Sequence, residues 1–598
     1  MKQLHHDGVL VPPRYKGKSL SIKVKEKRIK LTPEQEEMAL AWTKKIGTPY
    51  VEDPVFAKNF HRDFSKRLGM NLKPDDVNYS EILSIVEEER NWKANLSKKE
   101  KKQLASQRKA QREANKDHYG YAKVDAVQME IANYAAEPSC IFMGRGKHPL
   151  RGRWKEGPHE EDIELNLSPD APRPPGNWKA IVWEPNAMWI ARWQDKLSRK
   201  TKYVWFSDSS NPKQRKDIDK FDKAKSLRNK LALVQKHIVK NLDADDLKRR
   251  KTATVCFLID RLKIRVGDEK DPDEADTVGA STLRPEHIHS NNDGRVTFDF
   301  LGKDSVPHVF KVRLPENVIR NLKEFATNAK STLFDGVRSK HVSEFLDEVI
   351  TGLSAKVFRT YYSSEAVQTK LRKTAVRPEN PEYAKKYAAT MANLEAAKIC
   401  NHRRTISKTW QQSLDKKKDR LKALKSRAKE TQAKMRQKSI EQEERHKERL
   451  KKQEEKLKSM NQKLEAYRQQ LAHQKQQAKP TSAMEKRISH QRSAIRRQKQ
   501  RLTELKTKHA ERMNKQRQRL EDRMHRDKIA IEKQKIRIET QRETRDYNLT
   551  TSLKSYIDPR IYYEWGKQVD YDWKQYYSKT LQKKFSWVEK EETASKYN

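Results

Sequence analysis

Cysteine and long apolar runs are scarce in this sequence, and each scarcity excludes a class of protein. Its three cysteines, Cys140, Cys256 and Cys400, lie far apart and form no CxxC pair. That spacing excludes a disulfide framework and a cysteine-ligated zinc site, and it fits a reducing compartment. No run approaches the roughly 18 apolar residues of a membrane span, and residues 1–18 lack the apolar stretch of a secretory signal. We therefore expect a soluble intracellular protein with no membrane partner.

Negative charge is also in short supply. Asp and Glu number 83 against 131 Lys and Arg, so the formal net charge is +48. A surplus of this size predicts a polyanionic partner, of which nucleic acid is the commonest. Hydrophobic residues make up only 34% of the chain, so part of it must be extended or highly solvated. The 12 Trp, 15 Phe and 20 Tyr argue against disorder of the whole chain.

The motifs of nucleotide-driven and metal-dependent enzymes are missing. No GxxxxGK[ST] loop occurs, and the sequence Gly144-Arg145-Gly146-Lys147 has neither its spacing nor its Ser or Thr. No GxGxxG follows a predicted strand, and HExxH does not occur. We expect neither a cofactor nor a bound metal.

The composition divides the chain into four parts: 1–210, 211–408, 409–547 and 548–598. The first mixes short apolar runs with Pro and Trp and contains a charged stretch, 86–116, that predicts an exposed helix. The second is the most globular. Residues 252–262 predict a buried helix there, and the alternating segments 296–302 and 308–314 predict a hairpin.

Residues 411–550 contain no Gly, Phe or Trp and one Pro, and hold 43 Lys and Arg against 20 Asp and Glu. Apolar residues recur every seven positions on both sides of Pro480, for example Leu450, Leu457, Leu464 and Leu471. This pattern predicts two helices of about 65 residues paired as an antiparallel coiled coil, each reaching roughly 100 Å. Many seam positions are Gln, Lys or Arg, so a single flexible helix is the alternative.

The last part, 548–598, is rich in Tyr and Trp but too short to fold alone, so it must dock on the earlier core. The fold class expected is α+β and mostly helical, with a bilobed body, a long antiparallel coiled coil and a small helical C-terminal domain.

Five scattered residues have side chains suited to phosphate chemistry: Arg265, Lys303, Arg359, His402 and Tyr556. Taken singly, an Arg or Lys in so basic a chain is most often a solvated charge. Likewise, a Tyr in an aromatic segment most often packs. Spacing alone therefore assigns none of them a role.

The chain resembles the eukaryotic-type DNA topoisomerases of class IB along nearly its whole length. Seven motifs carry the resemblance in the family's order, with the coiled coil before the tyrosine: 142–149, Arg265 with 274–279, 298–305, 355–361, 400–402, 556–560 and 584–587.

The resemblance implies that Arg265, Arg359 and His402 surround the nucleophile Tyr556 and that Lys303 is the general acid. It also implies DNA contacts by a second set of residues: Arg145, Lys147, His148 and Asp304. The implied reaction is single-strand cleavage through a 3′-phosphotyrosyl intermediate, strand rotation and religation. It would relax supercoils of both signs without ATP or metal. The implied partner is supercoiled double-stranded DNA, enclosed by a clamp of the first two parts of a monomeric chain. The coiled coil would either brake the rotating DNA or merely tether the tail.

Departures from the family pattern raise further expectations. Ser555 stands before the tyrosine where the family usually has Asn, which puts sensitivity to inhibitors of the cleaved complex in question. The coiled coil is longer than usual, and a long charged N-terminal extension is missing. Archaeal relatives have such short forms, so we expect a nucleoid rather than a nuclear location.

Two other functional classes compete with this interpretation. A tyrosine site-specific recombinase uses a similar set of residues, and a non-enzymatic architectural protein could bridge duplexes with the basic coiled coil.

Overall fold

The computed structural model describes residues 1–25, 27–268, 275–290 and 294–590. Glu274, part of one family motif, lies outside the described residues. The chain forms two compact units: residues 1–380, 388–404 and 547–598 make the first, and 381–387 with 405–546 make the second. The expectation of a mostly helical α+β fold with two long paired helices is confirmed. None of the described helices is long and apolar enough to cross a membrane.

The first 206 residues build small sheets and four helices around two apolar cores. One core lies under the sheets β1-β5-β6 and β10-β9-β11-β12, and the other under helices α1 to α3 and the sheet β3-β2-β4. The helices are α1 Pro33–Thr43, α2 Pro54–Leu68, α3 Ser80–Asn95 and α4 Lys98–Tyr119. The strands are β1 Leu4–His6, β2 Ser21–Val24, β3 Lys27–Lys30, β4 Val77–Asn78, β5 Tyr121–Val124, β6 Val127–Glu130, β7 Cys140–Ile141, β8 Trp154–Lys155, β9 Ile163–Asn166, β10 Ala180–Val182, β11 Trp189–Gln194 and β12 Thr201–Trp205.

The prediction of one exposed helix over 86–116 was wrong about its continuity. The segment spans the end of α3 and most of α4, and the helix breaks at Leu96 and Ser97. Ser97 accepts a hydrogen bond from the backbone N–H of Glu100, whose side chain accepts one from the Ser97 N–H. This capping box starts a new helix. Exposure was predicted correctly for α4, none of whose residues is buried, whereas Val86 at the start of the stretch is buried.

The described residues between 224 and 358 pack around one large apolar core, whereas α10 packs in the cluster that it shares with the C-terminal segment. The expected buried helix is α6, and the expected hairpin is formed by β14 and β15, with β13 added on the outer side of β14. The helices are α5 Asn211–Asn241, α6 Leu247–Leu262, α7 Glu316–Thr327, α8 Ser339–Asp347, α9 Ala355–Arg372 and α10 Glu382–Ile399. The strands are β13 Ile288–Ser290, β14 Arg295–Gly302 and β15 Val306–Arg313.

The C-terminal segment docks on the earlier core, as its length required. Its helices are α13 Leu549–Ser555, α14 Pro559–Gln568 and α15 Lys579–Lys584. Tyr562, Phe585 and Trp587 are buried together with Phe221 of α5 and Val367 of α9 in one apolar cluster. This cluster fixes the position of α13.

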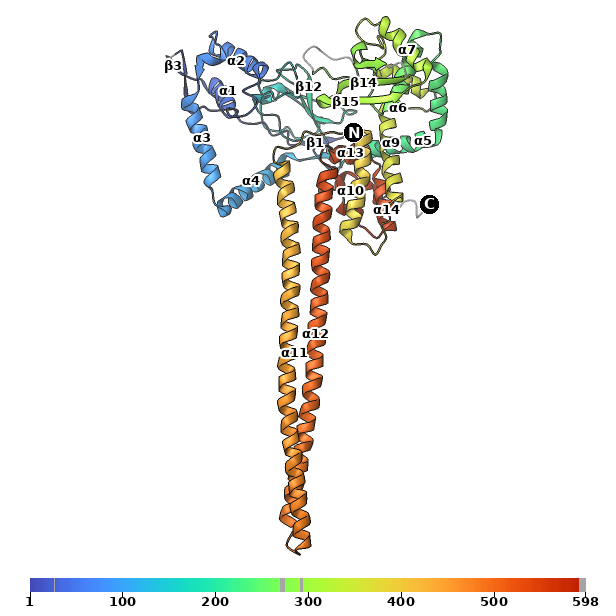
Figure 1. Ribbon diagram of the computed structural model, residues 1–598. Coiled ribbons are helices and arrows are strands. Elements are labelled where there is room, and N and C mark those ends of the chain that lie inside the picture. The colour runs from blue at the N-terminus through green and yellow to red at the C-terminus, as the bar shows by residue number, and fades with distance from the viewer. Residues whose placement is uncertain (26, 269–274, 291–293, 591–598) are drawn as a thin grey trace. The chain divides into compact units, whose positions relative to one another are not determined.

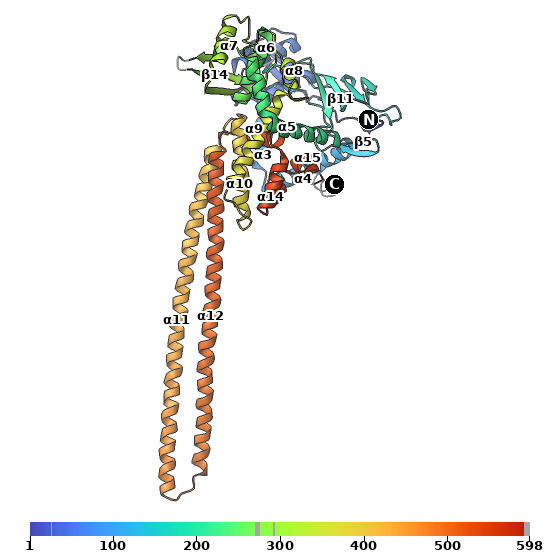
Figure 2. The same cartoon turned by 90° about the vertical axis from the view of Figure 1, so that its right-hand side faces the viewer.

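The second unit is the predicted antiparallel pair, α11 Trp410–Gln476 and α12 Ser482–Glu543. The two helices run side by side along their length in both views (Figures 1 and 2). The turn between them contains Pro480, as the heptads on its two sides predicted.

Glutamine side chains of α12 form hydrogen bonds to α11 at the polar positions of the seam between the two helices. Their side-chain amides donate to backbone carbonyls of α11: Gln491 to Met460 at 2.8 Å, Gln498 to Gln453 at 3.2 Å, Gln534 to Lys417 at 2.9 Å and Gln541 to Trp410 at 3.2 Å. From Gln491 to Gln498, and again from Gln534 to Gln541, a step of seven residues up α12 matches a step of seven residues down α11. These hydrogen bonds therefore fix the antiparallel register, as buried polar residues do in other coiled coils.

Replacing Gln498 by Glu should destabilise the helix pair, because a carboxylate cannot donate to the Gln453 carbonyl. The side chain is only 3% exposed, so an unpaired acceptor there should cost about 1–3 kcal/mol. Amide hydrogen exchange of α12 measures the effect. Gln500→Glu, at an exposed position two residues away, should leave exchange unchanged. Equal protection in the two variants would contradict a register role for Gln498.

Candidate active site

Tyr556 is the first residue after α13, where it caps the helix with its N–H bonded to the Ser552 carbonyl at 2.9 Å. The side chain of Ser364, on α9, donates to the Tyr556 carbonyl at 3.2 Å and accepts from the Asp558 N–H at 3.0 Å. Further back along α13, the Ser552 hydroxyl donates to Asn393 of α10 at 2.9 Å. The tyrosine is therefore held from α9 and α10, and it is only 7% exposed.

Arg359 and His402 lie against the Tyr556 ring. The guanidinium carbon of Arg359 is 4.8 Å from the ring centroid, and the His402 ring centroid is 5.3 Å away. Arg359 projects from α9 and donates through Nη2 to the Cys400 carbonyl at 2.7 Å. Both Arg359 and His402 are buried. Burial, together with the charges of Arg359 and Arg265, lowers the pKa of His402 to about 3, so the imidazole is neutral.

Two buried N–H groups in this cluster have no partner. The His402 Nε2 atom lies 3.3 Å from Arg359 Nη2, and a guanidinium only donates, so Nε2 accepts and Nδ1 carries the proton. That Nδ1 atom and the Nε atom of Arg359 are both buried without a hydrogen-bond partner. Buried donors are normally paired, so the pair is suited to an incoming anion.

Arg265 completes the group around the tyrosine. Burial, followed by the neighbouring Arg359, lowers the pKa of the Arg265 guanidinium, and its hydrogen bond to the Tyr556 side chain opposes that shift. Its chain segment is held by the Ala280 N–H, which donates to the Arg265 carbonyl at 2.8 Å. The two segments approach so closely that a Cβ on Gly279 would lie 2.5 Å from the Gly267 backbone.

Lys303, the remaining residue of the expected five, stays apart. It is exposed at the turn between β14 and β15, and no hydrogen bond or ion pair among the described residues joins it to the other four. Asp304 and Ser305 in the same turn have φ of 67° and 56°. These left-handed conformations are unfavourable for residues with a side chain, and strain of this kind is often found at functional sites.

The residues expected to contact DNA gather near this turn only in part. Arg145 forms an ion pair with Asp304, while His148 packs edge-on against Phe142 at 4.8 Å and Lys147 is exposed. A cavity of about 660 Å³ lies beside them, lined by both segments. The Arg145 side chain is 72% exposed, so the pair is weak and an arriving ligand can open it.

His308 is a neighbour of the site that the sequence analysis missed. It pairs with Phe300 across the hairpin, and the two rings stack at 5.1 Å. Burial and the charges of Arg359, Arg265 and Arg403 lower its pKa to about 4. A Cβ on Gly302 would lie 2.5 Å from its Nε2 atom, so the glycine gives the ring its space. Its place on the inward face of an alternating strand was the available signal. Among the residues described, no cluster of three metal-binding side chains occurs.

The lowered pKa of His402 predicts instability in acid. In the folded chain its pKa is about 3, whereas an unfolded histidine has a pKa of about 6.5. As the pH drops below about 6.5, His402 becomes protonated in the unfolded state but stays neutral in the folded state. The free energy of unfolding therefore decreases. Each such histidine contributes about 1.4 kcal/mol per pH unit.

Denaturant titrations between pH 6 and pH 4 measure this slope. His402→Gln should reduce it by about 1.4 kcal/mol per pH unit, whereas His118→Gln, at an exposed position on α4, should keep the wild-type slope. An unchanged slope in His402→Gln would refute the assignment of a neutral buried imidazole.

Three protein-family models match most of the chain, all but residues 207–208, 436–527 and 598. Residues 1–206 match the family described as eukaryotic DNA topoisomerase I, DNA binding fragment, and residues 209–435 match its catalytic core. Residues 528–597 match the C-terminal topoisomerase domain.

Curated relatives come from plants, fungi and animals. DNA topoisomerase 1 beta of Arabidopsis thaliana is 35% identical over 69% of this chain and 46% of its own length. DNA topoisomerase 1 of Mus musculus is 32% identical over 70% of this chain and 58% of its own, and that of Homo sapiens is 33% identical over 69% and 56%. The chain spans about half the length of the curated relatives it matches. It belongs to the eukaryotic-type DNA topoisomerase IB family, with that family's DNA-binding, core and C-terminal parts in order.

Proposed function

We propose that this protein is a type IB DNA topoisomerase that relaxes positive and negative supercoils by transient cleavage of one strand. The observation that carries the proposal is the grouping of Arg265, Arg359 and His402 around Tyr556, with buried N–H groups on Arg359 and His402 left for an anion. A phosphodiester placed there would satisfy these donors.

The Tyr556 hydroxyl is the nucleophile of the proposed cleavage. It attacks the phosphorus and gives up its proton to water, the bond from phosphorus to the 5′ oxygen breaks, and a 3′-phosphotyrosyl bond forms. Negative charge grows on the non-bridging oxygens, where two guanidiniums and the His402 Nδ1–H stabilise it. Losing one such preorganised donor typically costs about 10²–10³ in rate.

Lys303 is the proposed general acid for the departing 5′ oxygen. Its exposed turn must then approach the scissile phosphate when DNA binds. The phosphotyrosyl bond replaces the phosphodiester bond one for one, so religation reverses the step and needs no ATP. The fixed cations supply the charge stabilisation that a metal ion provides in other phosphoryl-transfer enzymes.

Supercoiled duplex DNA is the proposed substrate, bound by a monomer whose residues 1–210 and 211–408 close around it as a clamp. Arg145, Lys147, His148 and Asp304 are proposed to contact the DNA near the cut. The hairpin of α11 and α12 would either brake the rotating duplex or tether the C-terminal segment. The proposed location is the chromosome, which means the nucleus in a eukaryote or the nucleoid if the chain is an archaeal short form.

Relaxation of a negatively supercoiled plasmid, in EDTA and without ATP, tests the proposal. Wild-type protein should relax it in steps, and Tyr556→Phe should not, because the variant keeps the ring but lacks the attacking oxygen. Both should still bind the plasmid. Binding without relaxation by either protein would favour an architectural role, and activity confined to defined sites would favour a recombinase.

A substrate with sulfur in place of the 5′ bridging oxygen tests Lys303 separately. A thiolate leaves without a proton, so Lys303→Ala should slow cleavage of ordinary DNA by about 10²–10⁴ and cleave the sulfur substrate at nearly the wild-type rate. Arg359→Ala is the matched control and should stay slow on both substrates, because charge still grows on the non-bridging oxygens. If sulfur fails to rescue Lys303→Ala, Lys303 is not the general acid.

A further inference from the structure

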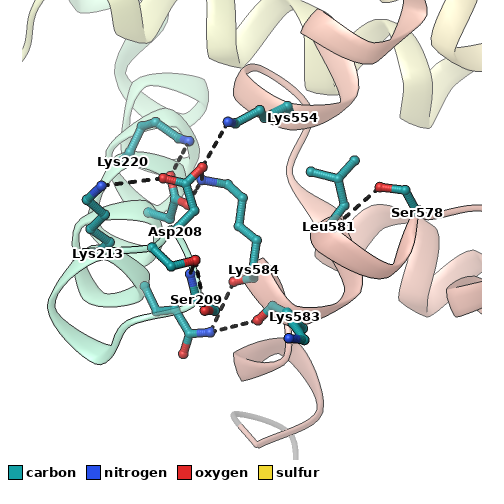
Figure 3. Close-up of polar contacts among 12 residues, drawn as sticks. Asp208, Ser209, Lys213, Lys220, Lys554, Ser578, Leu581, Lys583 and Lys584 are labelled. Carbon is teal, nitrogen blue, oxygen red and sulfur yellow. Dashed lines mark hydrogen bonds and ion pairs between the residues drawn. The ribbon is translucent and has the colours of Figure 1, made fainter. Parts of the chain in front are cut away.

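Three lysines, one from the start of α5 and two from the C-terminal segment, converge on the carboxylate of Asp208 (Figure 3). Lys554 lies 2.9 Å from it, and Lys213 and Lys584 each lie 3.7 Å away. Burial alone would raise the pKa of Asp208, but its hydrogen bond to Lys554 and the charges of Lys584 and Lys213 hold that pKa below its ordinary value. The carboxylate is therefore ionised and shared by three segments.

The segment that carries Asp208 is held firmly in place. Asp208 lies between β12 and α5, where the Ser207 N–H donates to the Glu130 carbonyl at 2.7 Å and the Ser210 N–H donates to the Ser207 carbonyl at 3.0 Å. The Ser209 hydroxyl donates to the Glu130 carboxylate at 3.3 Å. Asp208 is thus a fixed charge, positioned between the segments that match the DNA-binding fragment and the catalytic core.

Lys554 connects this fixed charge to the nucleophile. It is in the last turn of α13, two residues before Tyr556. The Ser552 and Ser364 contacts hold the same turn from α10 and α9. Asp208 adds a third contact to the last turn of α13. This contact is an ion pair, and it comes from outside α9 and α10.

Docking of the C-terminal segment does not depend on Lys554. The apolar cluster around Phe585 is buried, Lys584 pairs with Asp217 at 2.5 Å, and Arg560 pairs with Asp222 at 2.8 Å. The Lys554 side chain is 52% exposed, so its loss leaves no cavity. An exposed pair of this kind contributes little to stability.

We propose that Asp208 is a positioning residue for the nucleophile: through Lys554 it fixes the end of α13, and so the direction from which the Tyr556 hydroxyl meets the phosphate. The proposal rests on the proposed cleavage reaction. Misplacement of a nucleophile lowers the rate of the chemical step without weakening substrate binding.

Single-turnover cleavage of a duplex oligonucleotide that loses its short downstream fragment, which carries the free 5′ hydroxyl, after cutting measures that step. Lys554→Met should lower the cleavage rate by about 10-fold, with DNA affinity and melting temperature near those of wild type. Lys554→Arg, which keeps the charge, should restore most of the rate. Lys579→Met, at an exposed position on α15, is the matched control and should cleave like wild type.

Asp208→Asn distinguishes positioning from direct binding of a DNA phosphate by Lys554. Positioning predicts slower cleavage in Asp208→Asn, and a Lys554→Met/Asp208→Asn double variant no slower than Asp208→Asn alone. Added salt should also reduce the difference in cleavage rate between Lys554→Met and wild type, because salt screens the ion pair between Lys554 and Asp208.

Wild-type cleavage rates in Lys554→Met, or tighter DNA binding by Asp208→Asn with unimpaired cleavage, would overturn the proposal. Failure of the wild-type protein to form any covalent adduct would instead overturn the proposed function.

Discussion

Packing of the C-terminal segment against α5, α9 and α10 determines whether the candidate site exists. Arg359 and His402 belong to the core, and Tyr556 reaches them only after the chain has passed through α11 and α12. The buried aromatic cluster around Tyr562 and Phe585 fixes the segment, and polar contacts then orient the tyrosine within it. Apolar burial provides most of the docking energy, whereas hydrogen bonds and ion pairs set the geometry.

The site concentrates positive charge in a buried place, which is unfavourable for the protein alone. Arg265 and Arg359 repel each other, and burial together with their charges keeps His402 and His308 neutral by lowering the pKa of each. An anion bound there would relieve the repulsion and provide acceptors for the unpaired N–H groups. In the proposed reaction, this unfavourable arrangement of the free protein would favour binding of the phosphate, since buried cations and donors gain most when their partner arrives.

Sequence patterns predicted the elements whose periodicity is strong. The heptads gave α11 and α12, apolar content gave α6, and alternation gave the hairpin of β14 and β15. The break at Ser97 was missed because a local capping box overrides a continuous charged pattern. Arg265, Arg359, His402 and Tyr556 were named through a family resemblance. No local pattern brings together residues so far apart in sequence, and only tertiary packing does.

Asp208 and His308 show more clearly which residues cannot be predicted from sequence patterns and motifs. Neither belongs to a recognisable motif, and each acquires its environment from segments far along the chain. His308 faces arginines contributed by three different segments, and the Asp208 carboxylate faces two lysines of the C-terminal segment, about 350 residues or more further along the chain, as well as Lys213 close by. Such neighbours follow from the docked structure, so they can be found only after the fold is known.

The residues that flank α11 and α12 lie next to each other beside the candidate site. This explains how so long a helical insertion can leave the geometry of the site undisturbed. Arg403 and Tyr547 form an antiparallel β-bridge, and the Asn548 N–H donates to the His402 carbonyl at 2.7 Å. The chain thus leaves the first unit and returns to it at the same place, where these hydrogen bonds hold the two strands of chain together. Bringing the two ends of a flexible loop together costs only about 0.6 kcal/mol more in free energy for each doubling of its length. The fixed register of α11 and α12 makes this entropic cost smaller still. The length of α11 and α12 can therefore vary without moving His402 relative to Tyr556, so the hairpin is free to acquire a function of its own.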